Sequence, residues 1–226
     1  MLIFVTATRK SLQDFEKSPL GQSLLRIAFD ESLDLTLVGS TENKLGLPAV
    51  YNKVITEQYR GHEAVFLHDD VWLDDIFAPE RLRDGLRQFD VIGLAGNRVL
   101  HPDAPTWLFK DDSMQSDSGN LSGLVCHGAS PFGRASYYGS LPACVQLLDG
   151  VLIAARISSL LDAGIRFDER FDFHFYDLDF SRQANAAGLK VGTWPLSITH
   201  ASVGALGSDD WKRGLELYRN KWQNAG

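Results

Sequence analysis

The chain has 226 residues, of which 44% are hydrophobic and 23% charged, a globular composition that excludes a wholly disordered chain. Its 22 Lys and Arg against 29 Asp and Glu give a net charge of −7, which argues against binding nucleic acid or an anionic membrane through bulk charge. Two cysteines imply no disulfide framework, and no apolar run approaches the ~20 residues of a membrane span. We therefore expect a soluble, cytoplasmic protein.

Short apolar runs alternate with amphipathic stretches over the first hundred residues. The first run stops at Thr6 and has no basic residues before it, so we interpret it as a strand and not as a signal peptide. The expected strands are Leu2–Val5, Leu33–Val38, Ala64–Leu67 and Val91–Leu94; the expected helices carry Leu24, Leu25 and Ala28, then Val50, Val54 and Ile55 after Pro48, then Leu82, Leu86 and Phe89. This order predicts an α/β fold with a mostly parallel sheet between layers of helices.

The pattern changes after residue 97. Residues 97–143 are rich in Pro, Gly and Ser, which predicts a long irregular segment of the kind that is usually functional or mobile. Order resumes at Val145–Leu148, and then come an expected strand over Val151–Ala155, a helix that stops at Gly164, a helix over Leu178–Ala187, strand signals over Lys190–Ile198 and an amphipathic helix over Asp209–Trp222. No linker divides the chain, so residues 1–226 are treated as one domain.

The sharpest local pattern is Phe66-Leu67-His68-Asp69-Asp70-Val71, in which an apolar strand ends in three titratable residues. Side chains alternate along a strand, so His68 and Asp70 are expected to point one way and Asp69 the other. Open α/β sheets bind ligands at the carboxyl ends of their strands, and a mixed His/Asp set suits Mn²⁺ somewhat better than Mg²⁺. The alternative is a polar turn whose aspartate caps a helix.

A second candidate site opens the helix near residue 177. Asp177 stands where an N-cap residue belongs and Asp179 in the first turn, where carboxylates stabilise a helix, so capping and catalysis are both open. The aromatic neighbours favour catalysis, because an apolar environment raises the pKa of a carboxyl as a general base requires. His174, between Phe173 and Phe175, is more simply explained as a packed histidine.

The third candidate is His200, at the end of a predicted strand. A lone histidine is more often structural, but this one can complete a metal site with His68 and Asp70. The sequence contains no phosphate-binding P-loop, no G-x-G-x-x-G after the first strand, and no H-E-x-x-H, G-x-S-x-G or paired C-x-x-C motif. These absences disfavour P-loop enzymes, ordinary dehydrogenases, zincins and α/β-hydrolases.

The order of these features resembles the GT-A fold glycosyltransferases, in particular the inverting, family-2-like bacterial group that uses nucleotide sugars. The likeness covers most of the chain and is strongest from Asp149 to Trp222. Four segments carry the likeness. His68-Asp69-Asp70 resembles the D-x-D strand end, with His68 in the first acidic position, and Asp149-Gly150-Val151 resembles the strand that enters the acceptor region. Tyr176-Asp177-Leu178-Asp179 resembles the E-D-x-D motif, with Tyr176 replacing Glu, and Thr199-His200 resembles the segment with the C-terminal histidine.

The resemblance implies a role for each part of the chain. Residues 1–96 would bind the nucleotide sugar, and residues 97–226 would bind the acceptor and carry catalysis. Asp70 and His200, with His68, would hold Mn²⁺ or Mg²⁺, and Asp177 would be the general base, with Asp179 as the second candidate. The residues implied around the nucleoside are Thr6, Thr8, Arg9, Ser40, Asn43, Asn52, His68 and Asp69.

The expected reaction is the inverting transfer of a sugar from a nucleotide-diphospho-sugar to a hydroxyl of a saccharide or glycoconjugate acceptor, as in polysaccharide biosynthesis. UDP is one candidate for the donor nucleotide. Two other functions stay open: a metal-dependent hydrolase or nucleotidyltransferase acting on nucleotide sugars, and a non-catalytic module that binds nucleotides or carbohydrates. Fold alone does not decide among them.

Overall fold

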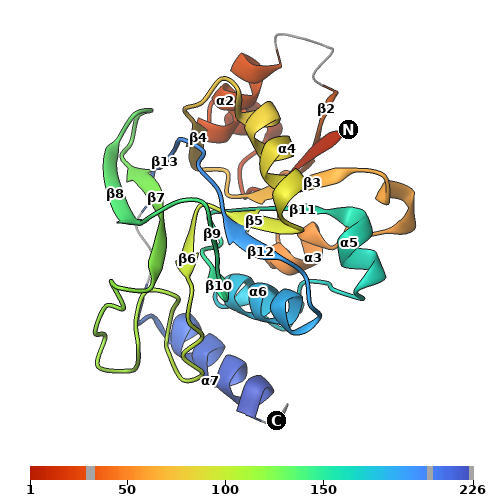
Figure 1. The fold of residues 1–226 in the computed structure, drawn as a ribbon. Coiled ribbons are helices and arrows are strands. Elements are labelled where there is room, and N and C mark those ends of the chain that lie inside the picture. Colours follow the sequence, from red (N-terminus) through yellow and green to blue (C-terminus); the bar gives the residue numbers. More distant parts are fainter. Residues whose placement is uncertain (29–33, 203–205, 224–226) are drawn as a thin grey trace.

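Two β-sheets organise the computed structural model, which describes residues 1–28, 34–202 and 206–223 (Figure 1). The larger sheet has seven strands in the order β2-β1-β3-β11-β5-β12-β9. Their bounds are β1 Leu2–Ala7, β2 Leu35–Ser40, β3 Glu63–Leu67, β5 Val91–Gly93, β9 Ala143–Cys144, β11 Leu152–Arg156 and β12 Val191–Thr193. The expected strand Leu33–Val38 corresponds to β2, although residue 33 itself lies outside the described residues.

The larger sheet is mixed, which corrects the expectation of a mostly parallel one. β1 is parallel to β2 and β3, but β11 lies between β3 and β5 and is antiparallel to both. Parallel neighbours need a crossover that returns the chain to the other end of the sheet. The chain instead leaves the end of β5, builds the second sheet and re-enters at that same end. The start of β11 therefore lies beside the end of β3, where the His68 N–H donates to the Val151 carbonyl at 3.4 Å.

The second sheet has the order β10-β6-β7-β13-β4, with β8 paired to β7. Its strands are β4 Val71–Leu73, β6 Ala95–Asn97, β7 Leu121–His127, β8 Arg134–Gly139, β10 Leu147–Leu148 and β13 Ile198–His200. The segment 97–143 is thus not wholly irregular. Gly123 in β7 has a φ of +130°, and a Cβ there would lie 2.4 Å from the Leu94 carbonyl oxygen, so this glycine allows a close strand approach and does not mark a loop.

Helices cover both faces of the larger sheet, which confirms the α/β sandwich. Figure 1 shows α2 and α4 on one face and α3 and α6 on the other. The helices are α1 Leu12–Phe15, α2 Pro19–Ile27, α3 Leu47–Tyr51, the 3₁₀ helix η2 Glu57–Tyr59, α4 Ala78–Gln88, α5 Ile157–Asp162, α6 Tyr176–Ala186 and α7 Asp209–Gln223. Over the described residues, no helix combines the length and apolar character needed to cross a membrane.

The buried face of α2 differs from the expected one. Leu20, Ser23 and Ile27 are buried, whereas Leu25 is 65% exposed. Ser18 accepts a hydrogen bond from the Gly21 N–H at 3.2 Å and so caps the helix. This cap and the Pro19 at the first helical turn set the start of α2.

An aromatic cluster fills the space between the larger sheet, α3 and α6. Phe167 stacks on Phe180 with ring centroids 4.0 Å apart and meets Phe66 of β3 edge to face at 4.9 Å. Tyr51 of α3 contacts both Phe66 and Tyr176, at 5.1 and 5.9 Å. All five rings are buried. This packing fixes the start of α6 against the carboxyl end of β3.

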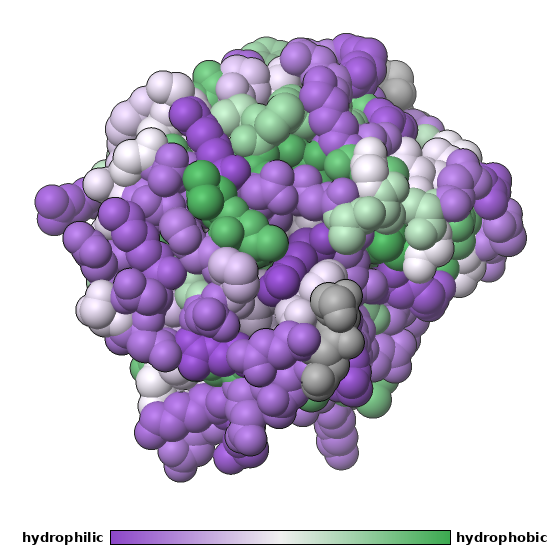
Figure 2. All heavy atoms as spheres, turned by 60° about the horizontal axis from the view of Figure 1, so that its bottom comes forward, coloured by the Kyte–Doolittle hydropathy of each residue, from purple (hydrophilic) through white to green (hydrophobic). Residues whose placement is uncertain are grey.

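An ion pair with a buried carboxylate holds helix α7 against α6. The Lys221 ammonium lies 2.8 Å from the carboxylates of both Asp179 and Asp168, and the Trp222 indole N–H donates to Asp179 at 2.9 Å. Arg219 binds the carbonyl oxygen of Asp103 and, at 2.6 Å, the carboxylate of Asp112. The surface on this side of the molecule is mostly hydrophilic, with separate hydrophobic groups (Figure 2). Helix α7 thus joins α6 to the segment after β6.

Replacing Lys221 with methionine should lower the free energy of unfolding by about 2–4 kcal/mol, because the fully buried Asp179 carboxyl loses its countercharge. Chemical denaturation monitored by circular dichroism measures the change. Lys212→Met on the same helix is the control, since its ion pair with Asp209 is exposed and should contribute less than about 0.5 kcal/mol. Equal losses in the two variants would contradict the proposed fastening.

Candidate functional site

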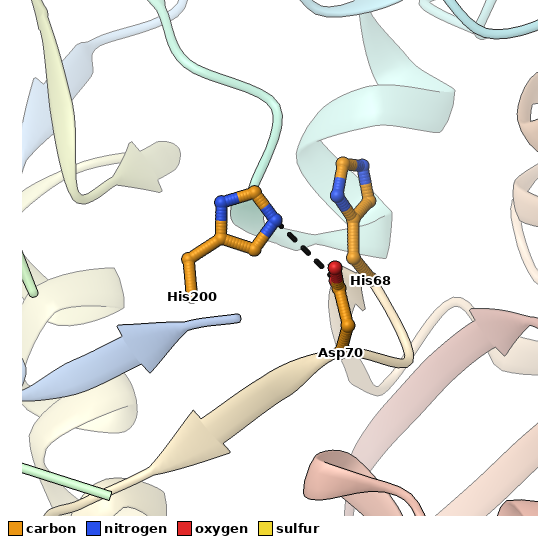
Figure 3. Close-up of side chains that lie close together, drawn as sticks. All are labelled: His68, Asp70 and His200. Carbon is orange, nitrogen blue, oxygen red and sulfur yellow. Dashed lines mark ion pairs between the residues drawn. The ribbon is translucent and has the colours of Figure 1, made fainter. Parts of the chain in front are cut away.

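Three side chains from the ends of two strands form a possible metal site, the His/Asp triad His68, Asp70 and His200 (Figure 3). His68 and Asp70 lie in the turn between β3 and β4, and β13 pairs with β4 so that His200 faces Val71. One ligand atom from each residue lies within 4.8 Å of the others. His200 Nε2 is 3.3 Å from Asp70 Oδ1, the contact dashed in Figure 3.

The pKa shifts of Asp70 and His68 suit a divalent cation. Burial would raise the pKa of the Asp70 carboxyl, but hydrogen bonds from His200 and Ser202 outweigh it and hold the pKa well below the usual value. Burial lowers the pKa of His68, and the neighbouring His200 lowers it further. A carboxylate and a neutral imidazole are the forms that bind metal ions. The donor set of two imidazoles and one carboxylate therefore fits a divalent cation.

Tyr176 orients His68 through a short hydrogen-bond chain. The Tyr176 hydroxyl donates to the Gly150 carbonyl at 2.8 Å and lies 3.1 Å from His68 Nε2. Because the hydroxyl has a single hydrogen, it accepts the proton of Nε2 and leaves the Nδ1 lone pair of His68 free. A Cβ at position 150 would lie 2.5 Å from the Tyr176 hydroxyl oxygen, so the chain requires glycine there.

Asp177, a half-buried carboxyl, directly follows Tyr176 in the sequence. It lies in the first turn of α6 and is not the N-cap residue as expected, because Phe175, with a left-handed φ of 67°, occupies that position. Burial raises the pKa of Asp177 to about 7, and the carboxylate of Asp149 adds to the rise. A general base that works near neutral pH needs such a value.

The smaller of two cavities, of about 530 Å³, brings these groups together. It is lined by His68 and His200 of the triad and by Asp149 and Asp177, with Trp107 among the apolar groups. The Trp107 indole N–H donates to Asp149 Oδ2 at 2.8 Å, and the Val151 N–H donates to Oδ1 at 2.9 Å. The segment 97–143 therefore shapes this cavity and also fixes one of its carboxylates.

The larger cavity, of about 850 Å³, lies next to the carboxyl ends of β1, β2 and β3, and Phe173 and His174 line both cavities. Four of the expected nucleoside contacts line it: Thr8, Arg9, Asn43 and Asp69. The Thr8 hydroxyl donates to Asp69 Oδ2 at 2.5 Å, and Lys10 Nζ is 2.6 Å from the same oxygen. As expected from strand alternation, Asp69 lines one cavity and His68 the other.

Five of the expected site residues line neither cavity: Asp70, which belongs to the triad, and four others that make structural contacts. Thr6 is fully buried, and the Ser40 hydroxyl donates to Asn43 Oδ1 at 3.1 Å. Asn52 is buried and holds both backbone polar groups of Phe167. Asp179, fully buried, faces Lys221 and Trp222. Their contacts are those of structural residues, so Asp177 alone is carried forward as the candidate base.

Three residues at the site had no role assigned from the sequence. Asp149 and Tyr176 belong to motifs noted above, but their contacts with Trp107 and His68 join residues 42 and 108 positions apart. His127 lines the smaller cavity and pairs with His200 across β7 and β13. No local spacing signals these contacts, because they depend on which strands become neighbours.

Comparisons with solved structures give three structures of similar fold at low sequence identity, two of them of the same protein. S. aureus TarS matches 96% of this chain and 39% of its own, with a TM-score of 0.54 and 14% identity. S. aureus TarS 1–349 in complex with UDP matches 96% of this chain and 64% of its own (0.50, 16%). GalNAc-T7 with UDP, GalNAc and Mn²⁺ matches 98% of this chain and 49% of its own (0.50, 11%). This chain thus spans between 39% and 64% of the length of these structures.

The chain has the GT-A glycosyltransferase fold. The resemblance seen in the sequence is confirmed at that level, with a mixed sheet in place of a mostly parallel one. No protein-family model and no curated protein matches the sequence. Within the GT-A fold, the His/Asp triad and Asp177 stand at the edge where β3 ends and β11 begins.

Replacing Asp177 with asparagine should stabilise the metal-free protein above neutral pH. Its pKa is raised from 3.8 to about 7 by folding, so between pH 4 and 7 the unfolded chain loses this proton while the folded chain keeps it, and stability falls. The free energy of unfolding of Asp177→Asn should equal that of the wild type near pH 4 and exceed it by about 1–2 kcal/mol above pH 7, after allowance for partial exposure. Thermal or chemical denaturation of both proteins across this pH range measures the difference. A pH-independent difference would contradict the raised pKa.

Proposed function

We propose that this protein is a metal-assisted, inverting glycosyltransferase that moves a sugar from a nucleotide-diphospho-sugar to an acceptor hydroxyl. The observation that carries the proposal is a shared cavity: its wall holds Asp177, a carboxyl with a pKa of about 7, together with His68 and His200 of the triad. The GT-A fold supports the same assignment. The larger cavity beside it has room for a nucleotide.

The larger cavity suits an anionic donor. Five cationic side chains line it, those of Arg9, Lys10, Lys44, Arg170 and Arg213, together with three carboxylates, those of Asp69, Asp172 and Asp210. The cations outnumber the carboxylates here, which favours an anionic ligand although the chain as a whole is acidic. UDP is bound in the TarS and GalNAc-T7 structures, so UDP-sugars are the first donors to assay.

The smaller cavity suits the acceptor. Trp107 and Tyr138 meet edge to face at 5.0 Å on its wall, and aromatic rings pack against the apolar faces of sugars. Asp149 offers carboxylate oxygens to hydroxyl groups, while Trp107 and Val151 hold it in place. We assign this cavity to a saccharide or glycoconjugate acceptor.

The residues supply one proton transfer. An acceptor hydroxyl attacks the anomeric carbon, a new C–O bond forms as the bond to the diphosphate breaks, and the hydroxyl proton passes to Asp177. The electron pair leaves with the nucleoside diphosphate, and attack from the opposite face inverts the anomeric configuration. A divalent cation held by His68, Asp70 and His200 would neutralise charge on the leaving diphosphate. The departing group then needs no protein acid, in contrast to the two carboxyls of a glycosidase.

The direct test incubates the protein with UDP- and GDP-sugars, a saccharide acceptor panel and Mn²⁺, and measures released nucleoside diphosphate and glycoside. Asp177→Asn should lower kcat by at least about a hundredfold with donor affinity nearly unchanged, because it removes only the base. Asp179→Asn is the matched control: it lies outside the cavities, and Lys221 keeps its ion pair with Asp168.

Two outcomes would contradict the proposal. Free sugar or sugar phosphate as the main product in the presence of acceptor would identify a hydrolase. Failure of every nucleotide sugar to bind, with or without metal, would exclude transfer from these donors. A kcat loss in Asp179→Asn in place of Asp177→Asn would refute the assignment of the base.

The pH profile gives a separate prediction. Because the base must be ionised, kcat/KM should rise about tenfold per pH unit below 7 and level off above it, as the raised pKa of Asp177 requires. Initial rates from pH 5 to 9 at saturating metal measure this profile. A profile that is flat from pH 5 to 7 would exclude a base with this pKa.

A further inference from the structure

We propose that the smaller cavity selects its acceptor by charge: it takes a saccharide that carries an ammonium group, binds a neutral saccharide less tightly and excludes an anionic one. The inference rests on the proposed function in calling this ligand an acceptor, but its binding test does not require sugar transfer. Three features carry it: the charges that line the two cavities, the unpaired carboxylates of Asp149 and Asp177, and the aromatic rings beside them.

The two cavities differ in the charges on their walls. Five Lys and Arg side chains line the larger one, against three carboxylates. Among the described residues that line the smaller one there is no Lys or Arg, whereas Asp149 and Asp177 both belong to its wall. Its four histidines carry charge only when protonated, and an imidazole of ordinary pKa is mostly neutral above pH 7. The larger cavity therefore attracts an anion and the smaller one a cation.

The two carboxylates of the smaller cavity are bound by neutral groups. The Trp107 indole and the Val151 N–H donate to Asp149, and backbone groups hydrogen-bond to Asp177. A Cβ at position 150 would lie 2.9 Å from the Cβ of Asp177, so Asp177 packs directly against the residue that follows Asp149. Besides burial, the carboxylate of Asp149 raises the pKa of Asp177. A positively charged ligand would relieve this repulsion between them.

Aromatic rings make the same wall suitable for an ammonium group. Trp107 and Tyr138 meet edge to face at 5.0 Å, and the rings of Phe175 and Trp211 lie 5.5 Å apart. The faces of such rings attract organic cations. A carboxylate binds an ammonium group through charge-assisted hydrogen bonds, which are stronger than neutral ones. The class of acceptor that matches both features is an amino sugar.

A divalent cation on the His/Asp triad would not reverse this preference. Its charge would face the carboxylate of Asp70 and the diphosphate of the donor, which together carry more negative charge than the ion carries positive charge. Asp149 and Asp177 would still determine the sign of the charge that the acceptor meets.

The experiment compares three methyl glycosides that differ in charge at one position: the 6-amino-6-deoxy sugar, the parent sugar and the uronate, each in the gluco and galacto configurations. Titration calorimetry on the full, chelator-treated chain at pH 7.5 measures their dissociation constants without any transfer. We expect the amino sugar of the preferred configuration to bind at least about tenfold more tightly than its parent sugar. The uronate should show no measurable binding.

Asp149→Asn should lower the affinity for the amino sugar by about tenfold, because it removes one of the two carboxylates. Its amide oxygen can still accept one of the two hydrogen bonds that hold the side chain. Asp162→Asn is the matched control: it changes the net charge by the same amount, but Asp162 is exposed and lines neither cavity. Its affinity for the amino sugar should equal that of the wild type.

If Asp149→Asn fails to fold, Leu206→Lys provides the second test. Leu206 is 50% exposed and lines the smaller cavity, so a lysine there can keep its charge in water. This variant should bind the amino sugar less tightly than the wild type does and should bind the uronate measurably. Leu12→Lys is its control, since Leu12 is also exposed and lines neither cavity.

Tighter binding of the parent sugar or the uronate than of the amino sugar would overturn the inference, as would the absence of saturable binding by either amino sugar. Equal losses in Asp149→Asn and Asp162→Asn, or in Leu206→Lys and Leu12→Lys, would do the same. These results leave the proposed function standing if transfer to a neutral acceptor is observed. Absence of transfer, with amino-sugar binding that depends on Asp149, would instead remove the proposed function and keep the charge-selective cavity.

Discussion

The site depends on one buried hydroxyl, that of Tyr176. It joins the end of β3, the turn just before β11 and the start of α6 through its contacts with His68 and Gly150. A polar group at this depth is costly unless it is satisfied, so its two partners hold these three segments in one arrangement. The metal triad and the candidate base then follow as neighbours, because His68 and Asp177 are attached to the joined segments.

The direction of β11 explains how that junction is possible. In a parallel arrangement the residues before β11 would lie at the far edge of the sheet, away from the end of β3. The antiparallel insertion brings Asp149 and Gly150 to the same edge as His68. The long excursion through the second sheet makes the insertion possible, and it also delivers Trp107 to the same cavity. The antiparallel direction of β11 is therefore what places the site residues of distant segments at one edge of the sheet.

Local patterns in the sequence were sufficient for the α/β sandwich and for the triad, because short apolar runs that end in polar residues mark the carboxyl edge of a sheet. They were not sufficient for the direction of β11 or for the partners of Asp149, which depend on distant strand pairing. The choice between Asp177 and Asp179 is instructive: residues two apart on a helix differ by about 200°, so one faces the cavity and the other the interior. Asp179 is the one that faces the interior, because Lys221 and Trp222 of α7 bind its carboxylate.

Helix α7 borders both cavities, with Trp211 on the smaller and Arg213, Gly214 and Leu217 on the larger. A wall shared by two binding spaces has a thermodynamic consequence. A ligand in one cavity that bound more tightly to one position of this helix would change the affinity of the other cavity, and linkage would make the effect reciprocal by the same factor. The ion pairs that hold α7 in place would then set the size of that coupling.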